Sequence, residues 1–235
     1  MATLELSGMS IVFVGSFNPE VFQPSWLVEQ GLLSKETANF ASSATDKPLL
    51  VSANVTNFAT DWFELQILRD RLVIATNDDS RKLELKDFAF GILTLLPETP
   101  VDAIGINTQA HFRADSAGAW NDFGDRFLPK DVWESILPEG PWKVRSGGLR
   151  VGMRTVVIEA SRDETVSPGL VRMEVGPSAL VEFGVYCAVN CHFGPPDGKS
   201  EPRESALHFS EILKDEWANA MSNSDQMIES IGASV

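Results

Sequence analysis

The feature that most constrains the fold is a run of alternating apolar and polar residues, VEFGVYCAVNCHF, at positions 181–193. Period-two alternation is typical of a β-strand, because successive side chains point to opposite faces of a sheet. The chain is therefore expected to form a sheet that buries one face of this strand. The apolar face would carry Val181, Phe183, Val185, Cys187, Val189 and Cys191, and the opposite face Glu182, Tyr186, Asn190 and His192.

A second segment, VDAIGINTQAHF at positions 101–112, has the same character. Ile104, Ile106 and Phe112 share its apolar face, whereas Asn107 and His111 share the other face. Each strand thus carries an Asn and a His on its more polar side. A β-bulge between them would reverse this assignment, because one extra residue flips every later side chain.

If the two strands are neighbours, their polar faces could combine into one site for general acid/base groups or a weak metal site. The alternative is that these residues only cap strand ends and bond nearby loops. No residue is assigned to catalysis, since no nucleophile turn or helical metal-binding motif accompanies the pattern. The six candidate catalytic residues are Asn107, His111, Glu182, Tyr186, Asn190 and His192.

Periodicity in the rest of the chain predicts an α+β fold. Residues 8–112 spell strand, helix, strand meander, helix and strand, which is the order of a ferredoxin-like split βαβ unit with one extra strand. The later half predicts a mostly antiparallel sheet closed by a C-terminal helix. The two clearest helices have apolar stripes formed by Leu85, Phe88, Ala89, Ile92 and Leu96, and by Ala206, Phe209, Leu213, Trp217 and Ala220.

The expected organisation has four parts. Residues 1–113 form the ferredoxin-like lobe, 114–140 a helical connector broken at Pro129, and 141–222 the antiparallel sheet with the C-terminal helix. The Ser-rich residues 223–235 are expected to be a frayed tail. Two sheet-bearing lobes and one continuous sheet both remain compatible with this pattern.

Charge and composition narrow the functional classes. The 235 residues carry a net charge of −14, which repels phosphate backbones and disfavours nucleic acid as a partner. The chain shows no signal peptide and no apolar stretch long enough for a membrane helix, so a soluble cytoplasmic protein is expected. Cys187 and Cys191 are interpreted as small buried apolar residues, because with His192 they fall short of the usual zinc ligand set. We expect no metal and no cofactor.

The segment WKVRSGGLRVGMR, from Trp142 to Arg154, is unusually basic for this acidic chain. The Gly-Gly pair at 147–148 predicts a hairpin, which would place Arg145 opposite Arg150. Opposed like charges are destabilising unless an acidic group meets them. The acidic counterpart could be the chain's own surface, a second copy of the chain or another protein, or a phosphate-bearing ligand. The expected partner-binding residues are Lys143, Arg145, Arg150 and Arg154, with Trp120 and Trp133 of the connector as a second surface.

These features favour a non-enzymatic protein that acts through protein–protein contacts, as a homo-oligomer or as a subunit of a complex. One alternative is a hydrolase or nucleotide-dependent enzyme that uses the Asn/His cluster. A second alternative is nucleic-acid binding through the basic hairpin, whose affinity would have to fall steeply with salt.

Overall fold

A computed structural model describes residues 2–43, 47–138, 140–141, 152–162, 168–195 and 204–235. Helix and strand are mixed, as the α+β prediction requires. The strands are β1 (Thr3–Gly15), β2 (Leu50–Val51), β3 (Val55–Ala59), β4 (Glu64–Leu68), β5 (Arg71–Thr76), β6 (Pro100–Arg113), β7 (Val156–Ser161), β8 (Gly169–Pro177), β9 (Gly184–Phe193) and β10 (Glu204–Ser205). The helices are α1 (Pro24–Glu29), α2 (Lys35–Ser43), α3 (Lys82–Leu95), α4 (Ala117–Phe127), α5 (Lys130–Ile136) and α6 (Ala206–Ser234).

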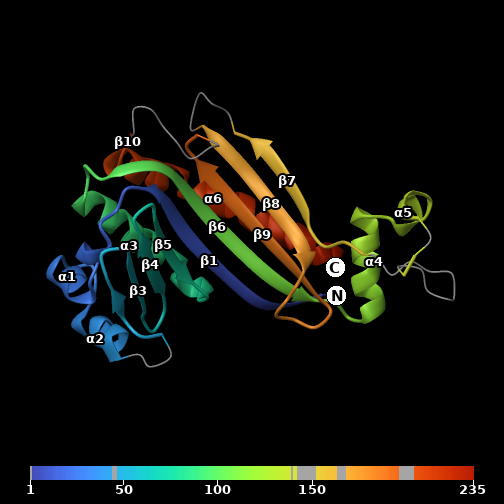
Figure 1. Ribbon diagram of the computed structural model, residues 1–235, viewed down its shortest axis with the longest axis horizontal. Helices are drawn as coiled ribbons and strands as arrows, with labels where there is room; N and C mark the ends of the chain where they lie inside the picture. The colour runs from blue at the N-terminus through green and yellow to red at the C-terminus, as the bar shows by residue number, and fades with distance from the viewer. Residues whose placement is uncertain (1, 44–46, 139, 142–151, 163–167, 196–203) are drawn as a thin grey trace.

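One antiparallel sheet runs through both halves of the sequence. Its strand order is β2-β3-β4-β5-β1-β6-β9-β8-β7, and β10 pairs with the start of β6. The long strands β1 and β6 form its centre, as Figure 1 shows. Because β6 pairs directly with β9, the two halves share one continuous sheet. The ferredoxin-like lobe over residues 1–113 is not confirmed, since the sheet continues past it without a break.

The core lies on one face of this sheet. Ile11 and Phe13 of β1, Ile106 of β6 and Cys191 of β9 are fully buried there. Helices α3 and α6 contact each other, and α6 also packs on β6 and β9. Figure 1 shows α6 running behind these two strands. Both predicted apolar stripes face the sheet, because the helices need to bury them against it.

Helix α6 extends well beyond its predicted end. The frayed tail expected over residues 223–235 is wrong, because helix continues to Ser234. Ser224 is fully buried, and Ile228 and Ile231 are less than a tenth exposed. These positions continue the buried stripe at helical spacing. Polar serines in this segment made the apolar periodicity too weak to recognise from the sequence. No helix in the described part of the chain is long and apolar enough to span a membrane.

The opposite face of the sheet carries mainly half-buried and exposed side chains. On β1, Ser10, Val12 and Val14 point to this face and are half-buried, whereas their neighbours Ile11 and Phe13 are buried. We call it the open face. Its character follows from strand parity, because only one face of the strands is covered by α3 and α6.

We predict that Ile228→Ala lowers the free energy of unfolding by about 2–4 kcal/mol, because it removes buried methyl groups and leaves a cavity. The matched control is Glu229→Ala, at the exposed next position, which should change stability by less than about 0.5 kcal/mol. Urea unfolding measures both. Equal, small effects would mean that the end of α6 is frayed after all.

Candidate functional site

Neighbouring strands β6 and β9 place Asn107 directly opposite Asn190. The Asn190 side-chain amide donates to Asn107 Oδ1 at 2.6 Å. Asn107 Nδ2 lies 3.3 Å from Ser10 Oγ and 3.4 Å from the Ser10 carbonyl oxygen on β1. The requirement that the two Asn/His strands be adjacent is therefore met, and both asparagines belong to one hydrogen-bonded group.

This group is the centre of a polar row across the open face. Asn190 pairs with Arg172 of β8, and Arg172 pairs with Glu159 of β7. Arg172 Nε and Glu159 Oε1 lie 3.4 Å apart. We call Ser10, Asn107, Asn190, Arg172 and Glu159 the polar row. Sequence patterns missed three of its members, because alternation assigns faces but not the register between strands.

A hollow of about 590 Å³ lies over the polar row. The hollow forms because the side chains of the open face are small here, among them those of Ala75 and Ala188. Gly8 adds to this effect, since a Cβ at Gly8 would lie 2.7 Å from the Asn77 side-chain oxygen. The glycine therefore leaves room for an amide side chain to lie across the strand. Asn77 and Gln109 bring further amides to the hollow.

One buried polar atom of the row lacks a hydrogen-bond partner among the described residues. Asn190 Oδ1 is buried and accepts no hydrogen bond from any described residue. A buried acceptor without a donor costs on the order of 1–3 kcal/mol. The amide pair therefore still has an unused acceptor beside the hollow.

The structure separates the two candidate histidines. His111 is paired with Tyr186, whereas His192 is paired with Gly105. These positions are six residues apart along β6, which corresponds to roughly 20 Å along a strand. His192 Nε2 lies 3.1 Å from the Pro195 carbonyl oxygen, so it is tied to the loop that follows β9. The two rings therefore cannot act together on one small substrate.

His111 forms a contact that resembles the start of a nucleophile–base pair. Its Nδ1 lies 2.8 Å from Ser178 Oγ. However, the Ser178 oxygen also accepts backbone N–H groups from Leu180 at 3.1 Å and Val181 at 2.9 Å. Ser178 is thereby held in the turn before β9. The contact is better explained as turn structure than as an activated nucleophile.

Burial keeps the His111 end of the open face uncharged. His111 is 7% exposed, and burial lowers its pKa below the usual 6.5. The pKa of Tyr186 is raised, mainly by burial and then by the nearby Glu174 carboxylate. Their ring centroids lie 5.0 Å apart. Near neutral pH both rings are therefore neutral, which suits packing.

Glu182 does not share the face of the other candidates. Residues 181–183 form a turn before β9, and Glu182 is exposed there. Phe183 has a φ of 51°, a left-handed conformation that breaks the strand. The alternation at 181–183 thus predicted three strand residues too many, and the placement of Glu182 on the polar face was wrong.

Cys187 and Cys191 point into the core, on the face opposite His192. Burial raises the pKa of the Cys187 thiol to about 12, so it carries no thiolate near neutral pH. Within the described ranges, no three His, Cys, Asp or Glu side chains are grouped to hold a metal ion.

The partner-binding candidates are only partly described. Lys143, Arg145 and Arg150 lie outside the described residues, whereas Arg154 is exposed just before β7. Trp120 of α4 is half-buried, and its indole N–H donates to the Gly184 carbonyl oxygen at 2.9 Å. Trp133 of α5 is half-buried and lines a small hollow with Leu128 and Leu137. Trp120 therefore has a structural role in anchoring the connector to the sheet.

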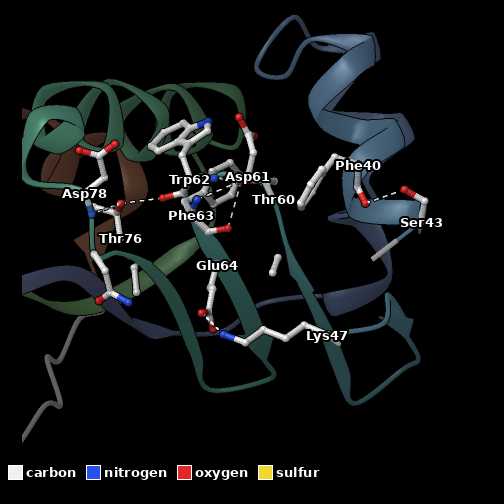
Figure 2. Close-up of a pocket in the computed structure, with 13 residues that line it drawn as sticks. Phe40, Ser43, Lys47, Thr60, Asp61, Trp62, Phe63, Glu64, Thr76 and Asp78 are labelled. Carbon is white, nitrogen blue, oxygen red and sulfur yellow. Dashed lines mark hydrogen bonds and ion pairs between the residues drawn. The ribbon is translucent and has the colours of Figure 1, made fainter. Parts of the chain in front are cut away.

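A second hollow, of about 720 Å³, lies between α2 and the β3–β5 strands. Figure 2 shows Lys47 reaching Glu64, with which it forms an ion pair. Thr60 Oγ1 accepts the Phe63 N–H at 3.0 Å, and Thr76 Oγ1 donates to the Trp62 carbonyl oxygen at 2.6 Å. Several polar groups that line this second hollow thus form hydrogen bonds that stabilise local turns. Ala75 and Asn77 line both hollows and connect this one to the polar row.

Comparison with protein-family models and with curated proteins gives no match for this chain. The site therefore has to be interpreted from its own chemistry. It offers side-chain amides, a hydroxyl and one Arg–Glu ion pair, and these groups bind and orient ligands more readily than they transfer protons at neutral pH.

We predict that His111 makes the protein less stable as the pH falls below about 6.5. The unfolded chain binds a proton there, whereas the buried imidazole resists it because its folded pKa is lower. Stability from this group is therefore full above 6.5 and declines toward the folded pKa. Urea unfolding of His111→Gln should show a weaker loss between pH 7.5 and pH 5.5 than the parent protein.

The matched control is His192→Gln, which keeps His111 and should keep the acid-dependent loss of stability. An unchanged pH dependence in His111→Gln would show that His111 is not the group responsible.

Proposed function

We propose that this chain acts without catalysis, through protein–protein contact, and that its partner is a second copy of itself. The observation that supports this is the edge strand β7. It ends the strand order of the sheet, and within the described residues no strand pairs with its outer side. Such an edge presents unpaired backbone groups that can pair with another strand.

The pairing with β8 identifies which backbone groups of β7 face outward. The Arg162 N–H donates to the Gly169 carbonyl oxygen at 2.9 Å, just after the last paired residues of the two strands. In an antiparallel ladder alternate residues bond the same neighbour, so Ile158 and Ala160 also bond β8. The N–H and C=O groups of Val157, Glu159 and Ser161 therefore point away from the sheet.

Side chains on β7 are unusually apolar for an exposed edge. Val157 is 42% exposed on the open face, and Ile158 is 57% exposed on the other face. Ile158 shares its face with Met173 and Val189 through the strand register, but α6 packs mainly on β6 and β9 and leaves Ile158 uncovered. An apolar edge strand with unpaired backbone groups can pair with a strand of another chain.

The sequence of β7 is complementary to itself. If two copies pair antiparallel about a two-fold axis at Ile158, that residue meets its own copy, and Val157 lies opposite Glu159. No like charges then oppose each other, and Glu159 keeps its ion pair with Arg172. An axis at Glu159 would oppose two carboxylates, which is destabilising. The self-complementary register supports a second copy as partner.

The other two functions have less support. An enzyme that uses both histidines would need them together, but they lie at opposite ends of the open face. Nucleic-acid binding would rest on the basic segment around Arg145 and Arg150, in a chain of net charge −14. We retain that segment as a further surface for protein contact, because it directly precedes β7 in the sequence.

We predict that Val157→Pro converts a dimer into a monomer without unfolding it. Proline removes an N–H that points outward, so the β7–β8 ladder loses no bond while the edge loses a donor. Val157→Thr is the matched control, since it keeps the N–H and the β-branched shape and should remain dimeric. Light scattering after size exclusion gives the mass of each, and circular dichroism checks the fold.

A parent protein that stays monomeric at micromolar concentration would contradict the proposal. A folded Val157→Pro variant that remains dimeric would place the interface elsewhere on the molecule.

A further inference from the structure

We infer that the hollow over the polar row binds a neutral ligand rich in hydroxyl groups, of the carbohydrate class. The inference does not depend on self-association through β7. The hollow has a volume of about 590 Å³, within the size range of small-molecule sites, and several polar side chains converge on it.

The polar groups in the hollow match hydroxyl groups. Asn77, Asn107, Gln109 and Asn190 each carry N–H donors and an oxygen acceptor on one uncharged side chain, and Asn107 and Asn190 already bond each other. A hydroxyl group also both donates and accepts hydrogen bonds, through its single oxygen. Asn107 and Asn190 are cross-strand neighbours, which lie about 5 Å apart, and Gln109 lies two residues farther along β6 on the same face. A ligand with several hydroxyls can pair with more than one of them.

The amide pair has an acceptor available for such a ligand. Asn190 Oδ1 lacks a donor among the described residues, although the Asn190 amide N–H is used on Asn107. Presenting this oxygen to the hollow requires the Asn190 amide to turn, which exchanges its present bond to Asn107 for bonds to the ligand. A ligand hydroxyl would supply the donor that this oxygen lacks among the described residues.

The charges around the hollow argue against ionic ligands. Arg172 is already paired with Glu159, and Glu174 adds a carboxylate at the same edge. Among its described lining residues, the site therefore has no unmatched positive charge for a phosphate or carboxylate ligand. The chain's overall charge of −14 disfavours anions further.

The location argues against an extended peptide. Peptides that add to sheets pair with an edge strand through backbone groups, whereas the hollow lies on the face of β1, β6, β9 and β8. Sheet faces are known to bind oligosaccharides in other folds. Tyr186, the one tyrosine of the chain, lines the same hollow and supplies an aromatic surface beside Glu174.

The test is titration of the ¹⁵N-labelled protein with three neutral trisaccharides: maltotriose, cellotriose and chitotriose. At least one should give saturable shifts in the side-chain amide signals of Asn107 and Asn190 and in the backbone signal of Ala188. Asn190→Leu should weaken binding roughly tenfold, since it removes the donor and acceptor at the centre of the row.

Ala188→Leu should abolish binding, because its larger side chain fills the hollow from the half-buried open face without touching the core. The matched control is Val14→Leu, which adds bulk to the same face outside the hollow and should leave affinity unchanged. Thermal melts confirm that each variant folds.

The inference is overturned if none of the three sugars causes saturable shifts, or if the shifts persist in Ala188→Leu. Shifts produced at these residues by an uncharged, capped tripeptide but by no sugar would overturn it as well. Val157→Pro should bind the sugar normally, so failure of the dimer and failure of this site are separate results.

Discussion

The rest of the structure depends on the burial of a single face of the central strands. Ile11, Ile106 and Cys191 line up across β1, β6 and β9 and are completely removed from water. The cover is α6, whose 29 residues extend over about 43 Å at 1.5 Å per residue. Strand parity then determines what faces water, because each buried residue has neighbours on the other side of the sheet.

This one-sided cover leaves two distinct surfaces. The open face gathers polar side chains where small residues keep the sheet low, and the polar row spans five strands there. At the far edge β7 lies beyond α6, so Ile158 stays exposed although the register places it on the same face as the core. A partner at the edge would leave the hollow over β1 and β6 accessible. Self-association and ligand binding can therefore be tested independently.

The sequence predicted the faces of the strands correctly, because alternation is a local property. It placed Asn107 and Asn190 on one side and Cys187 on the other, as the structure has them. It could not predict that Ser10 and Arg172 complete the row, since register depends on pairing between distant segments. It also missed the left-handed Phe183 that moves Glu182 into a turn, and the helical end of α6, whose serines mask its stripe.

The central claim, that β7 is a pairing edge for a second copy, is tested most directly by amide hydrogen exchange at high and low protein concentration. The N–H groups of Ile158 and Ala160 bond β8 and should exchange slowly at both concentrations. The outward N–H groups of Val157 and Glu159 should exchange slowly only when the protein is concentrated enough to dimerise. Fast exchange of these two amides at every concentration would contradict the account.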